Sequence, residues 1–129
     1  MSPVAYIVDD DESARRGLTR LVNCGGIEAR SFASAREFLD AKCQDEDACL
    51  VADVKMPEMS GLDLCRALSD AGAGIPVILI TAYDTSENRE AAMQAGAVAY
   101  LRKPVDGRAL LDAVRWALAH AHPRPPQSV

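Results

Sequence analysis

Apolar residues along this chain gather in five short continuous runs, and between the runs they recur at every third or fourth position. Continuous runs of this length are typical of strands that are buried on both faces, as in a parallel sheet. The second run alternates loosely and is the weakest of the set. We therefore predict strands over residues 4–8, 27–32, 49–53, 75–81 and 98–101.

The stretches between these runs have the apolar spacing of helices that bury one face. Glycines and capping residues mark their ends: Gly25 stops the first helix, Ser34 and Glu37 form a capping box at the second, and Asp106 caps the last. In the third helix we expect Leu62, Cys65, Leu68 and Ala71 to face inward, and in the fourth the apolar face is mostly alanine, with Met93 nearby. The predicted helices cover residues 13–24, 35–41, 61–70, 86–95 and 107–118.

Strands and helices alternate five times with short loops and no internal repeat. This alternation implies right-handed crossovers and an α/β fold, in which helices cover both faces of a five-stranded parallel sheet. The fourth helix buries little area because alanine side chains are small, so we expect it to pack weakly.

Length and composition refine this picture. A chain of 129 residues, half of them apolar, is large enough for one domain without disulfides. We expect residues 1–121 to form that domain and the proline-rich residues 122–129 to be a tail or the start of a linker. The net charge of −5 argues against nucleic-acid binding by this domain. Four cysteines without a CxxC pair, and no run long enough to span a membrane, favour a reduced, cytoplasmic protein.

Polar side chains follow the predicted strands at their carboxyl ends. Asp9 and Asp10 follow the first strand, Asp53 ends the third, Thr81 ends the fourth and Lys103 follows the fifth. In a doubly wound parallel sheet these ends meet at one edge, which is where such folds bind ligands. Taken one at a time, each residue has an ordinary explanation, as a turn former, a strand hydroxyl or a surface charge. These separate explanations do not predict that all five residues stand at the carboxyl ends of strands.

Three clustered carboxylates repel one another and stay ionised together only when a cation joins them. Oxygen ligands without His or Cys favour Mg²⁺ or Mn²⁺ over zinc. An EF-hand calcium loop starting at Asp9 fits poorly, because its glycine would fall on Ala14 and its bidentate glutamate on Arg20. A carboxylate beside a divalent ion and an ammonium can attack phosphorus, which gives an aspartyl phosphate.

Four segments give the chain a specific resemblance to the receiver domain of two-component response regulators, of the FixJ-type subgroup, over residues 3–119. They read IVDDDE at 7–12, DVKMPEMSG at 53–61, LITA at 79–82 and AVAYLRKP at 97–104. The resemblance implies a flavodoxin-like (βα)5 fold with strand order 2-1-3-4-5. It implies that Asp53 accepts the phosphoryl group, and that Asp10 and Asp53 ligate Mg²⁺ with the Lys55 carbonyl, with Asp9 helping directly or through water.

The resemblance also implies a switch. Lys103 is expected to pair with the phosphoryl group and to precede a cis peptide bond. Thr81 turns inward to bind a phosphoryl oxygen, with Ala82 beside it in the phosphate-binding set, and Tyr100 follows inward. Tyr83 is bulky at a point where attacking water passes, and the sequence leaves open whether this lengthens or shortens the phosphoryl lifetime.

By the same resemblance the phosphoryl donor is a sensor histidine kinase or a phosphotransfer protein. The surface of the fourth helix, fifth strand and fifth helix then controls an output, which is transcription if a DNA-binding domain follows; a phosphorylation-dependent homodimer stays open. A stand-alone receiver that shuttles phosphate or binds proteins is the alternative. The domain would catalyse its own phosphorylation and dephosphorylation without turning over external substrates. A metal-dependent phosphatase is disfavoured because Lys55 stands where such enzymes place a second acid, and a nucleotide-binding domain because no GxGxxG or GxxxxGK[ST] is present.

Overall fold

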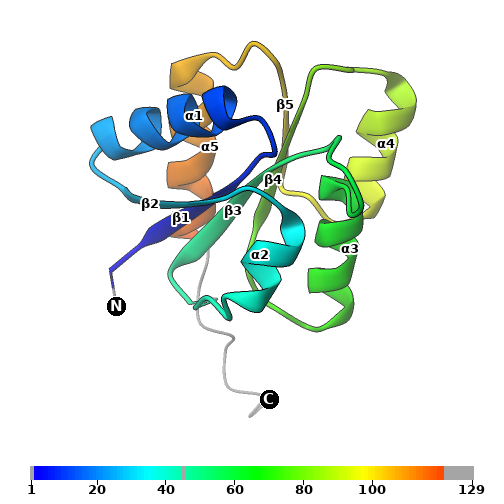
Figure 1. Cartoon of the computed structure of the whole chain (residues 1–129), viewed down its shortest axis with the longest axis horizontal. Coiled ribbons are helices and arrows are strands. Elements are labelled where there is room, and N and C mark those ends of the chain that lie inside the picture. Colours follow the sequence, from blue (N-terminus) through cyan, green and yellow to red (C-terminus); the bar gives the residue numbers. More distant parts are fainter. Residues whose placement is uncertain (1, 45, 121–129) are drawn as a thin grey trace.

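The computed structural model describes residues 2–44 and 46–120 of the chain. Strands and helices alternate as the apolar pattern predicts (Figure 1). The strands are β1 (Val4–Val8), β2 (Glu28–Phe32), β3 (Ala48–Asp53), β4 (Val77–Thr81) and β5 (Ala99–Arg102). The helices are α1 (Glu12–Cys24), α2 (Ala35–Asp40), α3 (Gly61–Asp70), α4 (Ser86–Gln94) and α5 (Gly107–Ala119). The proline-rich tail predicted for residues 122–129 lies outside the described residues.

All neighbouring strands are parallel, in the order β2-β1-β3-β4-β5, which confirms the predicted fold and strand order. The register brings the carboxyl ends of the strands to one edge. Val8 lies opposite Ala52, and Thr81 lies opposite Arg102. The residues that follow β1, β3 and β5 therefore begin next to one another, although the chain separates them widely.

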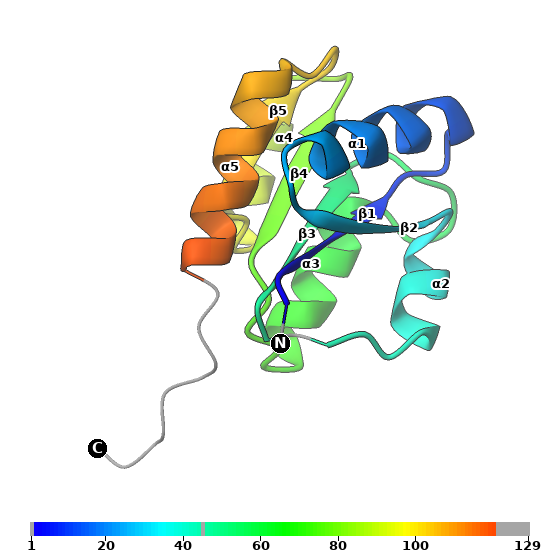
Figure 2. The same ribbon diagram turned by 90° about the vertical axis from the view of Figure 1, so that its left-hand side faces the viewer.

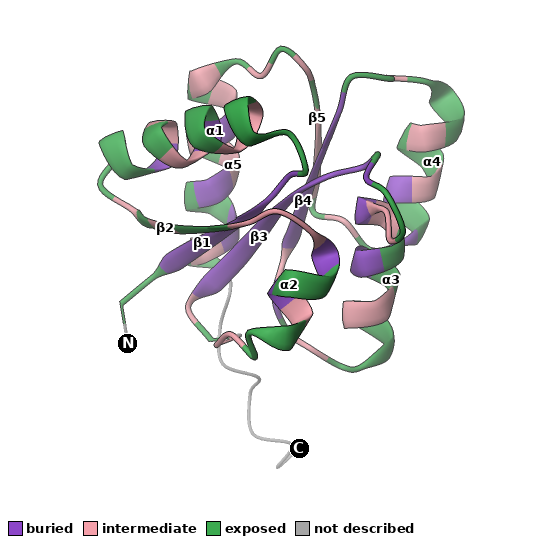
Figure 3. Cartoon of the chain, in the orientation of Figure 1, coloured by how far each residue is buried: buried purple, intermediate pink, exposed green. Residues whose placement is uncertain are grey.

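The three central strands are buried along their whole length, whereas the edge strands are not (Figure 3). This difference explains why the second apolar run is weak: β2 is an edge strand, and its outward side chains are exposed. A continuous apolar run is needed only where both faces of a strand are covered.

Two helical layers cover the sheet (Figures 1 and 2). Helices α1 and α5 lie on one face, and α2, α3 and α4 lie on the other. Each face has its own apolar core. The α1 and α5 side includes Leu18, Val22, Leu110 and Val114, and the opposite side includes Phe38, Leu64, Cys65 and Ala92. Burying a leucine or valine side chain stabilises the fold by about 1.5–3 kcal/mol.

Within the described residues, no helix is both long and apolar enough to cross a membrane.

Each helix begins at a side chain that accepts a hydrogen bond from the first turn. These N-caps are Asp11, Ser34, Ser60, Thr85 and Asp106. Such caps satisfy backbone N–H groups that have no partner within the helix. At α2 the predicted capping box forms differently, because the Glu37 carboxylate accepts from the N–H of Ala33 and not from that of Ser34.

The buried face of α3 differs from the predicted one, whereas that of α4 agrees with it. In α3 the most buried side chain is Leu64, whereas Leu62 and Leu68 are half-buried and Ala71 is exposed. The first residue of this helix, Gly61, packs against the backbone of β3. In α4 the buried residue is Ala92 and Met93 is 73% exposed, so the helix buries as little area as predicted.

Candidate functional site

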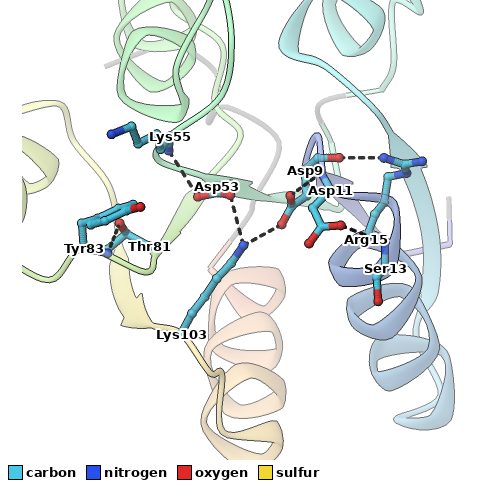
Figure 4. Close-up of polar contacts among 9 residues, drawn as sticks. All are labelled: Asp9, Asp11, Ser13, Arg15, Asp53, Lys55, Thr81, Tyr83 and Lys103. Carbon is cyan, nitrogen blue, oxygen red and sulfur yellow. Dashed lines mark hydrogen bonds and ion pairs between the residues drawn. The ribbon is translucent and has the colours of Figure 1, made fainter.

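The structure brings Asp9, Asp53 and Lys103 together at the carboxyl edge of the sheet (Figure 4). Lys103 follows β5, and its Nζ lies 3.1 Å from Oδ2 of Asp9 and 3.1 Å from Oδ2 of Asp53. The backbone N–H of Lys103 donates to the carbonyl of Thr81, and the Lys103–Pro104 peptide bond is cis, as expected from the resemblance. One ammonium therefore joins two carboxylates from different strands.

Asp9 is fully buried and is oriented by its neighbours in the chain. The N–H of Asp11 donates to Oδ1 of Asp9 over 2.9 Å, and the Arg15 guanidinium donates to the Asp9 carbonyl over 2.8 Å (Figure 4). These bonds leave the other carboxylate oxygen of Asp9 for Lys103. The sequence did not single out Arg15, because its position on the polar side of α1 looks like that of any solvated arginine.

Asp53 is held from the chain that follows it. Its side chain is 10% exposed, and Oδ1 accepts a hydrogen bond from the N–H of Lys55. Gly61, at the start of α3, lies next to the end of β3, because its N–H donates to the carbonyl of Val54. A Cβ at Gly61 would overlap the carbonyl oxygen of Asp53 and lie 2.9 Å from its carbonyl carbon. A side chain at this position would therefore displace the backbone of Asp53.

The site is strongly charged and partly closed to water. Burial raises the pKa of Asp53. The hydrogen bond and positive charge of Lys103 lower it, the negative charge of Asp9 raises it, and the net effect is an increase. Burial by itself would lower the pKa of Lys103, but hydrogen bonds to Asp53 and Asp9 raise it above that of an ordinary lysine. Lys103 is therefore a cation at neutral pH, and Asp53 is a weaker acid than an exposed aspartate.

Asp10 completes an acidic cluster. Asp9, Asp10 and Asp53 each offer one carboxylate oxygen, and these oxygens all lie within 4.8 Å of one another. Asp10 is exposed, so the cluster opens to solvent on its side. Three carboxylates face one ammonium, which leaves a negative charge that favours a cation. The donor set is all oxygen, which fits a hard ion such as Mg²⁺.

Thr81 is fully buried, and its hydroxyl accepts a hydrogen bond from the N–H of Tyr83 over 2.9 Å. Beside it is a cleft of about 280 Å³ lined by residues that include Lys55, Thr81, Tyr83 and Asn88. The Lys55 ammonium lies 4.7 Å from the centre of the Tyr83 ring (Figure 4). Ala82, which follows Thr81 in the chain, is exposed. The Lys55 side chain therefore points away from the acidic cluster and packs against the Tyr83 ring.

Tyr100, the second residue expected to move, lies on β5 beneath α4. The Arg89 guanidinium carbon is 5.6 Å from the centre of its ring. Solvent does not reach the Tyr100 hydroxyl, and the nearby Asp84 carboxylate interacts with it. No pattern in the sequence pointed to Arg89, because contact between α4 and β5 side chains depends on how the helix is rotated.

Comparison with known proteins gives a consistent result. Residues 5–115 match the family model described as the response regulator receiver domain. The chain is 42% identical over 114 residues to the transcriptional regulatory protein TdiR of Thauera aromatica, covering 88% of this chain and 50% of TdiR. It is 36% identical over 116 residues to the transcriptional regulatory protein FixJ of Azorhizobium caulinodans, covering 90% of this chain and 55% of FixJ.

Among solved structures, the crystal structure of FixJ-N superposes with a TM-score of 0.85 at 33% identity, covering 93% of this chain and 96% of that one. The chain thus spans about half the length of the curated relatives it matches, and nearly all of an isolated domain.

Proposed function

This chain belongs to the family of response regulator receiver domains, and on that premise we propose that Asp53 accepts a phosphoryl group from a phosphohistidine of a partner protein. The observation that carries the proposal is the position of Lys103, whose ammonium bridges Asp53 and Asp9. An isolated turn aspartate would have no such partner.

In the proposed step an oxygen of the Asp53 carboxylate attacks phosphorus. A phosphorus–oxygen bond forms, the phosphorus–nitrogen bond to the donor histidine breaks, and the departing imidazole nitrogen takes up a proton. Negative charge on the phosphoryl oxygens is then close to the Lys103 ammonium, which stabilises it electrostatically. The Lys55 N–H, which already donates to Asp53, fixes the carboxylate for attack.

Asp9, Asp10 and Asp53 are the residues that would hold a Mg²⁺ ion, with the Lys55 carbonyl as a further oxygen ligand. When bound, the ion neutralises charge on the phosphoryl oxygens. Without the ion, Lys103 is the cation that contacts Asp9 and Asp53, and the three carboxylates of the cluster would repel a phosphoryl group that approaches Asp53.

After transfer, we propose that the Thr81 hydroxyl turns from the Tyr83 N–H toward a phosphoryl oxygen, with Ala82 small enough to leave room. Tyr100 then repacks, and the surface of α4, β5 and α5 changes. The relatives TdiR and FixJ are named as transcriptional regulatory proteins, and this chain spans about half of each. The proposed role of the surface is therefore to control an output domain or partner, with a histidine kinase or phosphotransfer protein as the donor.

Intact-mass measurement tests the proposal. The protein is incubated with Mg²⁺ and acetyl phosphate, and we expect the mass of one phosphoryl group to be added. The Asp53→Asn variant should add none, whereas Asp112→Asn, an exposed aspartate of α5, should react like the wild type. A chain that gains no phosphoryl group with Mg²⁺ present would instead be a receiver that works only through protein contacts.

A further inference from the structure

The loop between β4 and α4 is joined to the helix by an ion pair. Nη2 of Arg89 lies 2.8 Å from both carboxylate oxygens of Asp84. The Asp84 side chain is only 15% exposed, whereas that of Arg89 is 59% exposed. The Asp84–Arg89 pair is much closer than the other helix-surface pairs, Glu12–Arg16 at 3.9 Å and Asp63–Arg66 at 3.7 Å.

The Asp84–Arg89 pair also covers Tyr100. The Arg89 guanidinium lies over the Tyr100 ring, which is a favourable cation–π arrangement. Burial raises the pKa of Tyr100, and the charge of Asp84 adds to this. Solvent does not reach the Tyr100 hydroxyl, and the nearby Asp84 carboxylate interacts with it. Both members of the ion pair therefore act on the Tyr100 side chain.

The same loop holds the Thr81 side chain. The N–H of Tyr83 donates to the Thr81 hydroxyl over 2.9 Å. The Asn88 side-chain amide of α4 donates to the Tyr83 carbonyl over 2.8 Å. Thr81 on β4 and Tyr100 on β5 are thus both connected to α4 through residues 83–89. These are the two side chains that the proposed function requires to move.

We propose that Asp84 and Arg89 are positioning residues of the phosphorylation response: their ion pair stabilises the loop and the Tyr100 ring in the arrangement seen here and opposes the shift of Thr81 toward phosphorylated Asp53. The inference rests on the proposed function and deepens it. Arg89 is largely exposed, and ion pairs with an exposed partner contribute little to overall stability, so the effect falls on the balance between two conformations. The planar guanidinium of Arg89 contacts Asp84 through Nη2 and also lies over the Tyr100 ring, and the ammonium of a lysine does not supply that planar group.

Binding of beryllofluoride in the presence of Mg²⁺ tests this inference, because beryllofluoride imitates a phosphoryl group on a carboxylate. The chain is compared with Asp84→Asn, Arg89→Gln and the double variant. We expect each to bind beryllofluoride roughly three- to tenfold more tightly, with Mg²⁺ affinity unchanged. The double variant should bind beryllofluoride as tightly as each single variant, because each single substitution already removes the whole Asp84–Arg89 interaction.

Two further variants separate positioning from a general loss of charge. Arg66→Gln breaks the Asp63–Arg66 pair of another helix, α3; Arg66 is about as exposed as Arg89, and the variant should bind beryllofluoride like the wild type. Arg89→Lys keeps the charge but loses the planar guanidinium that lies over the Tyr100 ring, so its affinity should fall between those of the wild type and Arg89→Gln. Thermal unfolding of each variant checks that it is folded.

Unchanged beryllofluoride affinity in Asp84→Asn and Arg89→Gln would overturn the inference, as would an equal gain in Arg66→Gln or a change in Mg²⁺ affinity alone. In all these cases the wild type still binds beryllofluoride, so the proposed function stands. A wild type that binds no beryllofluoride with Mg²⁺ present would overturn the proposed function, and the inference with it.

Discussion

The Nζ atom of Lys103 lies 3.1 Å from Oδ2 of Asp53, a residue 50 positions earlier in the chain. Lys103 is 23% exposed and Asp53 is 10% exposed, so the contact is partly shielded from water. The same ammonium reaches Asp9, 94 positions earlier. A single lysine therefore balances charge from two strand ends, and this arrangement determines how the site responds to mutation, pH and metal.

Replacing Asp53 with asparagine should stabilise the metal-free protein. The pKa of Asp53 is raised in the folded state, so the stabilisation from its protonated form is complete below the ordinary aspartate pKa and is lost as pH rises through the raised value. At neutral pH the ionised Asp53 therefore costs stability. We expect Asp53→Asn to raise the unfolding temperature by roughly 2–5 °C in EDTA.

This gain should shrink as the pH falls through the pKa of Asp53, because the wild-type carboxyl is then neutral as well. Added Mg²⁺ should reverse the order of the two proteins, since it binds the wild-type cluster better. The exposed Asp112→Asn should follow neither trend. A metal-free Asp53→Asn that unfolds below the wild type at neutral pH would contradict this account of the site.

Removing Lys103 should destabilise the protein most when no metal is present. Without its ammonium, Asp9 and Asp53 lie close together and lack a cation. We expect Lys103→Ala to lower the free energy of unfolding by about 1–2 kcal/mol in EDTA and by less in Mg²⁺. The pKa of Lys103 is raised, so its contribution is complete below the ordinary lysine pKa and disappears as pH rises through the raised value.

Chemical denaturation with and without Mg²⁺ measures this difference. Arg108→Ala removes an exposed cation from the first turn of α5 and should lose little stability under either condition. Equal losses for Lys103→Ala in EDTA and in Mg²⁺ would show that the ammonium does not balance the charge of the acidic cluster.

Gly61 should not tolerate a side chain. A Cβ at this position overlaps the backbone of Asp53, so either β3 or α3 must shift. We expect Gly61→Ala to cost about 1–3 kcal/mol and to weaken Mg²⁺ binding. Gly17→Ala is the matched control, because nothing lies within 4 Å of a Cβ in that exposed turn of α1; it should gain about 0.5–1 kcal/mol. Similar effects of the two substitutions on unfolding would refute this assignment.

Amide hydrogen exchange should be faster in α4 than in the central strands. Within α4, Ala92 is the buried residue, and an alanine side chain removes little apolar surface from water. Elements that bury little area open at low free energy. Protection across Ser86–Gln94 equal to that of β3 would argue strongly against α4 as an element that shifts.

Tyr83 should lengthen the lifetime of the phosphoryl group. The sequence left the direction open, but in the structure the Tyr83 ring packs against the Lys55 ammonium at the cleft beside Thr81. Removing the ring opens this side to water, so Tyr83→Ala should lose its phosphoryl group severalfold faster than the wild type. Met93→Ala removes another exposed apolar side chain, on α4, and should leave the lifetime unchanged. A longer lifetime in Tyr83→Ala would reverse the role assigned to the ring.

The elements were predictable because burial on two faces demands continuous apolar runs, and the strands begin and end within two residues of the prediction. The largest difference is at β4, which begins at Val77 because Pro76 cannot donate to the sheet. The meeting of Asp9, Asp53 and Lys103 was predictable for a similar reason: in a parallel sheet all carboxyl ends lie at one edge, wherever the residues stand in the chain.

Contacts that depend on side-chain direction were not predictable. The partner of the Thr81 hydroxyl, the contact of Arg89 with Tyr100 and the close approach of Gly61 to Asp53 all join separate segments. Each depends on how a loop or helix is rotated, and on that point the apolar pattern misjudged α3 by placing Leu64 outside the buried face.

The sequence by itself determined the α/β alternation, the strand ends that carry charge and the oxygen-only chemistry of the cluster, because these follow from the order and kind of residues. Only the tertiary structure decided that one ammonium bridges two carboxylates and that Arg89 of α4, paired with Asp84 of the preceding loop, lies over the Tyr100 ring. The physical reason is that strand periodicity is local, whereas the distance between two charged atoms is set by the packing of the whole fold.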